Sequence, residues 1–92
     1  MEIIKKVQSN YFEDILDGRK RFEVRLADFE CEPGDTIVLL EQKGQELTGR
    51  KIDCELLYKL NTKAVEKFYT KEDIDKYGLL ILAVRKKYDF KE

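Results

Sequence analysis

Apolar residues in this chain fall into short runs separated by polar turns, and the spacing within each run predicts its structure. Residues 21–26 alternate between charged and apolar side chains, which is typical of a strand with one buried face. Residues 36–40 and 79–84 are almost wholly apolar, which favours strands covered on both faces. Residues 3–7 and 50–60 complete a set of five predicted strands.

Three short helices are predicted between these strands. Asn10 begins a capping-box pattern at the start of the first helix, which carries an apolar stripe and ends at Gly18. Thr70, with Asp73 three positions later, begins the last helix, which ends at Gly78. A further helix is expected shortly before Thr70.

The 92 residues make one domain, because no repeat or linker divides the chain. The order of elements predicts an α+β fold: a small β-barrel of about five strands, with one N-terminal helix and short helices before the last strand. A parallel α/β fold is less expected, because each parallel crossover needs a dozen or more residues.

Composition excludes several classes of function. Apolar residues make up 42% of the chain, enough for one small core, and charged residues make up 40%. The net charge of -1 excludes a protein that coats nucleic acid by charge alone. The chain has no histidine, which removes Ser-His and Cys-His catalytic pairs and imidazole metal ligands. We therefore expect no metal and no cofactor.

Cysteine usage and the N-terminus indicate the compartment. Cys31 and Cys54 lack the close spacing of paired zinc ligands, and free buried thiols are favoured over a disulfide. Residues 1–6 lack the long apolar run of a signal peptide, and no apolar stretch approaches the ~18 residues of a membrane span. A cytoplasmic protein without membrane contact is expected.

The most informative charges lie in residues 18–26. The basic residues there are Arg19, Lys20, Arg21 and Arg25. Glu23 and Arg25 are two positions apart on the predicted strand, so both side chains leave the same face. Residues 27–35, which follow, are acidic. Two interpretations stay open: the charges neutralise each other on a solvated surface, or the basic residues line a cleft for an anionic or polar ligand.

The segment Gly18-Arg19-Lys20-Arg21-Phe22-Glu23-Val24-Arg25 resembles the ASCH domain family of the PUA-like superfamily, whose pattern is Gly-x-Lys-x-x-Glu-x-Arg after an N-terminal helix. Three later segments are similar to the family in the same order: Pro33-Gly34-Asp35-Thr36-Ile37, Thr48-Gly49-Arg50 and Lys76-Tyr77-Gly78-Leu79-Leu80-Ile81-Leu82. The middle segment is typical of a small phage and bacterial subgroup of unknown function. Two departures stand out: Glu2 replaces a histidine of the first strand, and Asp28 lacks its usual basic neighbour.

The resemblance implies a barrel with a cleft lined by the motif residues, and a role in binding RNA or modified nucleosides. The candidate ligand-binding residues are Arg19, Lys20, Glu23, Arg25, Asp28 and Tyr77. Lys20 and Arg25 would contact phosphate or a base acceptor, and Glu23 would accept from a base amino or imino group. An aromatic ring such as that of Tyr77 could stack on a base, although packing is the commoner role of such rings.

Two other functions stay open. Some members of the resembled family are hydrolases, including an acetylcytidine amidohydrolase and reported ribonucleases, so Lys20 and Glu23 are also candidate catalytic residues. Glu23 stands where the amidohydrolase carries a nucleophilic threonine, which argues against acyl transfer through a hydroxyl here. A protein-interaction domain, in which the motif only forms salt bridges, is the third possibility. Binding of RNA, a nucleoside or a nucleotide by a monomer is the expected function, with hydrolysis as the alternative.

Overall fold

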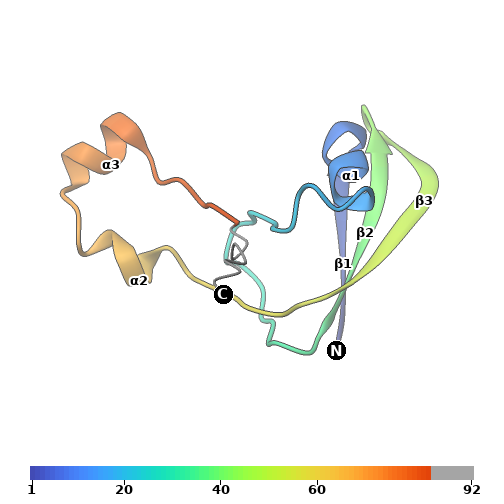
Figure 1. Ribbon diagram of the computed structural model, residues 1–92, viewed down its shortest axis with the longest axis horizontal. Helices are drawn as coiled ribbons and strands as arrows, with labels where there is room; N and C mark the ends of the chain where they lie inside the picture. The colour runs from blue at the N-terminus through green and yellow to red at the C-terminus, as the bar shows by residue number, and fades with distance from the viewer. Residues whose placement is uncertain (84–92) are drawn as a thin grey trace, which may run out of the picture.

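The fold is built on a three-stranded sheet formed by residues 2–55 (Figure 1). The computed structural model describes residues 1–83. Strand β1 (Glu2–Gln8) pairs in parallel with β2 (Thr36–Lys43), and β2 pairs antiparallel with β3 (Glu46–Glu55). The order β1-β2-β3 places the apolar strand β2 at the centre of an open mixed sheet.

Helix α1 (Ser9–Leu16) follows β1 directly and packs on one face of the sheet. Its Phe12 is buried against Val7 and Leu39, and these three side chains form the centre of a small core. Four partly buried residues pack around them: Ile15, Ile37, Ile52 and Cys54. The helix begins earlier than the capping-box pattern predicts, because Gln8 is the N-cap residue and no side chain caps it.

Residues 17–35 connect α1 to β2 without regular secondary structure. With α1, this connection is long enough to return the chain to the same end of the sheet, so β1 and β2 are parallel. The predicted turn before β2 is present: the amide of Asp35 donates to the carbonyl of Glu32 at 3.0 Å, and Gly34 has a φ of 98°. Glycine adopts this left-handed conformation without a steric cost.

The β2–β3 ladder contains an irregularity that matters for a polar site described below. The register shifts between Leu40 and Gln42, and Glu41 between them has no cross-strand partner. Such a shift bends a strand and redirects a side chain. The side chain of Glu41 is buried.

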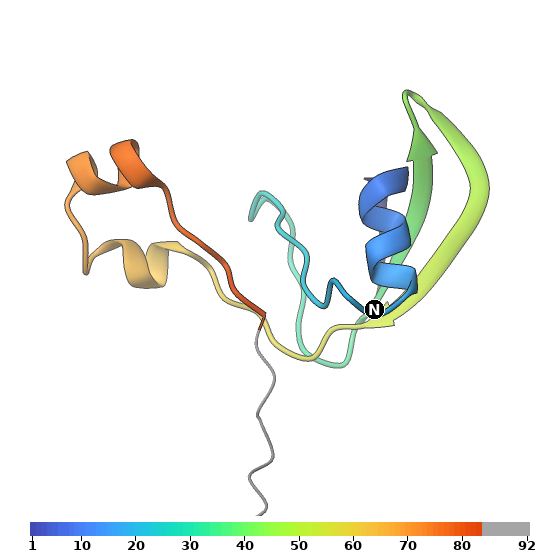
Figure 2. The ribbon, with the colours of Figure 1, turned by 45° about the horizontal axis from the view of Figure 1, so that its top comes forward.

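Residues 56–83, which we call the arm, extend away from the sheet (Figures 1 and 2). The arm contains α2 (Lys63–Glu66) and α3 (Lys71–Tyr77), and neither helix has a buried residue. The sequence signals for α3 are confirmed: Thr70 Oγ1 accepts from the amide of Asp73 at 3.1 Å, and Gly78 follows with a φ of 68°. The radius of gyration is 16.1 Å, against about 12 Å for a compact domain of this length.

The five-stranded barrel expected from the sequence is wrong. Of the predicted strands, residues 21–26 and 79–83 form no ladder, and residue 84 lies outside the described residues. Residues 21–26 pair with no strand among residues 1–83, and Val24 and Leu26 remain exposed. Residues 79–83 run back from α3 towards the base of the arm but pair with none of the three strands (Figures 1 and 2). With these two segments unpaired, the sheet keeps two free edges and does not close.

Three observations bear on the expectations from composition. Cys31 and Cys54 are free thiols, each partly buried. None of the helices within residues 1–83 combines the length and the apolar character that a bilayer span requires. Over the same residues, no group of three metal-ligating side chains comes together.

Candidate functional site

Lys20, Glu23 and Arg25 form one ion-pair cluster, which we call the motif cluster. Lys20 Nζ lies 2.8 Å from Glu23 Oε1, and Arg25 Nε lies 3.0 Å from Glu23 Oε2. The three side chains are 18%, 20% and 30% exposed in the order of the chain. Because both carboxylate oxygens are held by cations, the position of Glu23 is well defined before any ligand arrives.

Backbone carbonyls also anchor the motif cluster. Lys20 Nζ donates to the carbonyl of Phe22 at 2.7 Å, and Arg25 Nη2 donates to the carbonyl of Lys6 on β1 at 2.5 Å. An ammonium has three N–H donors and a guanidinium has five. Each cation therefore keeps donors that these contacts do not use, and those donors are available to a ligand.

A solvent-open hollow of about 370 Å³ lies beside the motif cluster. Its walls are formed by Tyr11, Asp14, Arg19, Lys20 and Phe22. Lys20 Nζ lies 4.8 Å from the centre of the Phe22 ring and 5.8 Å from that of Tyr11. Lys20 thus belongs to both the cluster and the hollow, whereas Glu23 and Arg25 lie outside the walls. The volume is at the lower end of the range for small-ligand pockets.

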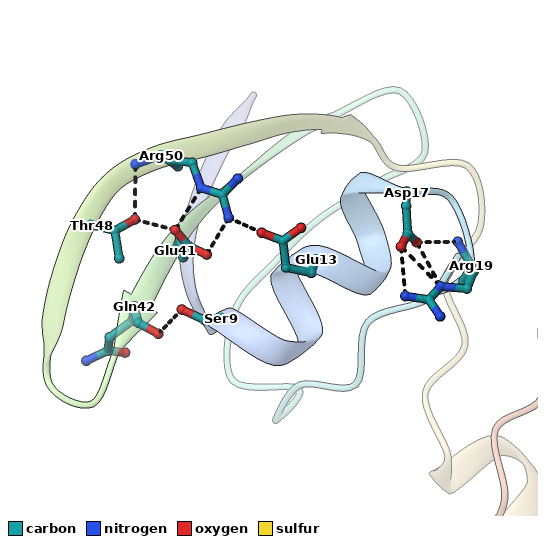
Figure 3. Close-up of polar contacts among 8 residues, drawn as sticks. All are labelled: Ser9, Glu13, Asp17, Arg19, Glu41, Gln42, Thr48 and Arg50. Atoms are coloured by element: carbon teal, nitrogen blue, oxygen red, sulfur yellow. Dashed lines mark hydrogen bonds and ion pairs between the residues drawn. The ribbon is translucent and has the colours of Figure 1, made fainter.

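The other sequence-predicted site residues are not joined to the motif cluster. Arg19 lines the hollow but pairs with Asp17 at 2.8 Å (Figure 3). It also pairs with Asp14 at 3.3 Å. The hydrogen bond from Arg19 lowers the pKa of Asp17 below its usual value. Asp28 and Tyr77 are both exposed, and within the described residues no hydrogen bond or ion pair links either to the cluster.

A second polar cluster, which sequence reasoning missed, surrounds Glu41 on β2. Glu41 is 4% exposed and is the buried charged residue of the described part of the chain. Its carboxylate accepts from Arg50 Nε at 2.9 Å, from Arg50 Nη2 at 2.8 Å and from Thr48 Oγ1 at 2.5 Å (Figure 3). Arg50 Nη2 also donates to Glu13 of α1. One guanidinium therefore connects α1, β2 and β3.

Electrostatics show that this second cluster is already neutralised. Hydrogen bonds from Arg50 and Thr48 lower the pKa of Glu41 from 4.5 to about 2, and they outweigh the opposing effect of burial. Glu41 and Glu13 in turn raise the pKa of Arg50. The Arg50 guanidinium lies 4.9 Å from the centre of the Phe12 ring, so it also covers the core.

An open hollow of about 570 Å³ adjoins these side chains, and Ser9, Asn10 and Lys43 complete its walls. Its charges are largely paired within the protein, which favours a structural role. A signal for this cluster was present in the sequence. Leu39 and Glu41 are two positions apart and therefore share one face of a strand, so a carboxylate was to be expected at a buried position.

Comparison with known proteins places the chain in a family. A family model described as a domain of unknown function (DUF3850) matches residues 4–73. The chain belongs to the DUF3850 family. The match runs from β1 into α3, so it includes both the motif cluster and the Glu41 cluster.

The DUF3850 chain is also similar to a phage protein. It is 39% identical over 51 residues to an uncharacterized 12.9 kDa protein in the GpA 3' region of Escherichia phage P2. The similar part is 55% of this chain and 47% of the phage protein, so the chain spans about half the length of that curated relative. No solved structure gives a significant match. Neither description assigns an activity, so functional inference rests on the geometry of the site.

Proposed function

We propose that this DUF3850 protein binds RNA or a nucleotide at the motif cluster and the adjoining hollow. One observation supports this above the others: the ammonium of Lys20 lies between the Glu23 carboxylate and the rings of Tyr11 and Phe22, at the wall of the hollow. Cations that contact phosphate, a carboxylate that accepts from base N–H groups, and aromatic rings that stack on bases are the chemistry by which single-stranded nucleic acids are bound.

Each residue has a distinct role in this proposal. The unused donors of Lys20 and Arg25 contact phosphate or base oxygens, and Glu23 accepts from a base amino or imino group. A base-edge contact of this kind discriminates by about 1–3 kcal/mol in DNA complexes, and stacking on a ring such as Tyr11 is worth about 1–3 kcal/mol per base. With a net charge of -1, the protein has little general attraction for a polyanion, so binding depends on this site.

The motif supports the same proposal. The order Gly18, Lys20, Glu23, Arg25 resembles the ASCH domain family, and we infer a relationship to that family from the motif and not from the fold, since the barrel is absent. The free thiols of Cys31 and Cys54 are compatible with action in the reducing cytoplasm.

Hydrolysis of RNA or of a modified nucleoside is less well supported by the geometry. A general base must accept a proton from the substrate or from water. Lys20 Nζ instead acts as a donor, both to Glu23 and to the carbonyl of Phe22. Both carboxylate oxygens of Glu23 accept hydrogen bonds from cations, so neither is free to approach a leaving group. Binding without turnover is therefore the main proposal.

The proposal is tested by comparing two lysine variants. The affinity for a short single-stranded RNA and for nucleoside monophosphates would be measured by calorimetry with Lys20→Ala and with Lys51→Ala. Lys51 is exposed on β3, where its ammonium lies 3.7 Å from Asp53 Oδ1, so its replacement removes the same charge away from the site. We expect Lys20→Ala to weaken binding about tenfold or more and Lys51→Ala to change it little.

Turnover is followed in the same samples. Short RNA and acylated cytidine would be incubated with the wild-type protein, and the products would be separated by chromatography. Product formation that disappears in Lys20→Ala would replace the binding proposal with the hydrolase. Equal affinity of the two lysine variants, or no binding of any of these ligands by the wild type, would overturn it.

A further inference from the structure

The arm exposes more apolar surface than a monomeric protein usually carries. Six of its large apolar side chains are at least 70% exposed: Leu57, Tyr58, Phe68, Tyr77, Leu80 and Leu82. Soluble monomers rarely expose contiguous apolar patches of more than a few hundred Å². At roughly 100 Å² for each side chain, these six expose about 600 Å² in total, which is a large apolar area for one short segment. The arm therefore has the composition of a surface that another surface covers.

Within residues 1–83, the rest of the chain does not cover the arm. Neither α2 nor α3 buries a residue, and neither packs extensively on the sheet or on α1. The base of the arm is anchored by Lys59, which donates to the Glu32 carboxylate and to the Cys31 carbonyl, both at 2.7 Å. Beyond this anchor the arm projects from the sheet in both views (Figures 1 and 2).

The sheet has an unpaired edge to which a segment of the arm can add. Strand β3 pairs with β2 on one side only, so its outer backbone groups have no strand partner among residues 1–83. The opposite edge is partly occupied, because Arg25 already donates to the Lys6 carbonyl on β1. Residues 79–83 are apolar and extended, which suits them to add as a strand to an unpaired edge.

We propose that two copies of this chain exchange arms, each arm covering the sheet of the other copy, with residues 79–83 paired to the free edge of the partner's β3. A second copy fits because one chain carries both the uncovered arm and the unpaired edge, so a two-fold exchange satisfies both features twice. All the exposed apolar side chains of the two arms would bury on the order of 1,800 Å², which lies within the range of stable interfaces. This dimer departs from the monomer expected from the sequence and does not depend on the proposed function.

The molar mass in solution tests the exchange directly. The chain mass is 10.9 kDa, so light scattering behind size exclusion should give about 22 kDa for the wild type at micromolar concentration. The double variant Leu80→Asp, Leu82→Asp should give about 11 kDa, since it places two charges in the proposed interface. Leu16→Asp is the matched control, because Leu16 is an exposed leucine on α1 outside the arm, and this variant should stay dimeric.

A milder variant and a labelling experiment complete the test. Phe68→Ser, in the turn after α2, should raise the dimer dissociation constant at least about tenfold even if the double variant does not fold. In a mixture of isotope-labelled and unlabelled wild-type chains, nuclear Overhauser effects should connect the methyls of Leu80 and Leu82 to β3 of the other copy. A dimer that survives both sets of substitutions would overturn the proposal.

A monomer would also overturn the proposal and would indicate what covers the arm instead. Contacts from Leu80 and Leu82 to the sheet of the same chain would assign the arm to its own copy. A monomer without such contacts would leave a different protein as the occupant of the arm.

Discussion

Arg50 donates two hydrogen bonds to Glu41, from Nε at 2.9 Å and from Nη2 at 2.8 Å, across the hairpin of β2 and β3. The same guanidinium donates to Glu13, which lies on the helix that covers this face of the sheet. The apolar cluster under α1 is small, with Val7, Phe12 and Leu39 as its buried side chains. A contact that joins a helix to two strands is therefore a large part of what holds the sheet and α1 together.

We expect Arg50→Met to lower the Tm by several degrees at neutral pH. Methionine keeps much of the length of the side chain but leaves the carboxylate of Glu41 buried without its cation, and an unpaired buried charge is costly. The measurement is thermal unfolding followed by circular dichroism. The double variant Arg50→Met, Glu41→Gln should recover part of the loss, because glutamine carries no charge. If the double variant is no more stable than Arg50→Met, the charge of Glu41 is not the cause.

The same pair predicts how stability depends on pH. The pKa of Glu41 is about 2 in the folded protein, against 4.5 when unperturbed. Because folding lowers this pKa, the stabilisation from Glu41 is fully present above about pH 4.5 and is lost as the pH falls towards about 2. Urea unfolding midpoints measured from pH 7 to pH 2 should therefore fall more steeply in the wild type than in Glu41→Gln. Parallel curves would show that Glu41 does not titrate with a lowered pKa.

The elements that local signals determine were predictable from the sequence. The apolar run of residues 36–40 predicted β2, and Gly34 lies in the turn that precedes this strand. Thr70 predicted where α3 begins. The barrel was not predictable in this way. Alternation in residues 21–26 indicates two different faces, but it carries no information on whether a neighbouring strand is present. Strand pairing depends on contacts between distant segments, and here residues 79–83 return along the arm without pairing to the sheet.

For the two polar clusters too, the sequence predicts contacts between near neighbours but not contacts that depend on strand pairing. Glu23 and Arg25 are two positions apart, so their spacing predicted a shared face, but it did not determine where Lys20 would point. Glu41 and Arg50 are nine positions apart, and their contact depends on the length of the hairpin and on the register shift next to Glu41. Neither feature is visible in the apolar pattern, because both arise from how the two strands pair.

The pKa of the Cys54 thiol depends on how close the motif cluster lies to β3. Burial raises the pKa of the Cys54 thiol, and the negative charges of Glu23 and Asp53 raise it further. In a Cys31→Ser background, Glu23→Gln should therefore lower the pKa of Cys54 and speed its alkylation by iodoacetamide at a given pH. The midpoint of the pH–rate profile is the measurement. The control is Glu55→Gln, which removes the neighbouring carboxylate of β3 that does not act on this thiol and should leave the midpoint in place.

The outcome of the Cys54 measurement bears directly on the proposed site. If Glu23→Gln leaves the midpoint unchanged while Asp53→Asn lowers it, Glu23 does not lie near β3. The motif cluster would then not rest against the sheet, and Glu23 would not lie where the proposed site requires it.

The N-terminus of α3 should depend on the hydroxyl of Thr70, which accepts from the amide of Asp73 at 3.1 Å. Replacing such a cap by alanine typically costs about 0.5–2 kcal/mol of helix stability. Since α3 has no buried residue within its own chain, Thr70→Ala should act locally, and amide hydrogen exchange in α3 should speed up about 2- to 30-fold while exchange in β2 stays the same. Thr70→Ser retains the hydroxyl and should behave as the wild type. Equal exchange rates for the alanine and serine variants would show that the hydroxyl does not hold the first turn of α3.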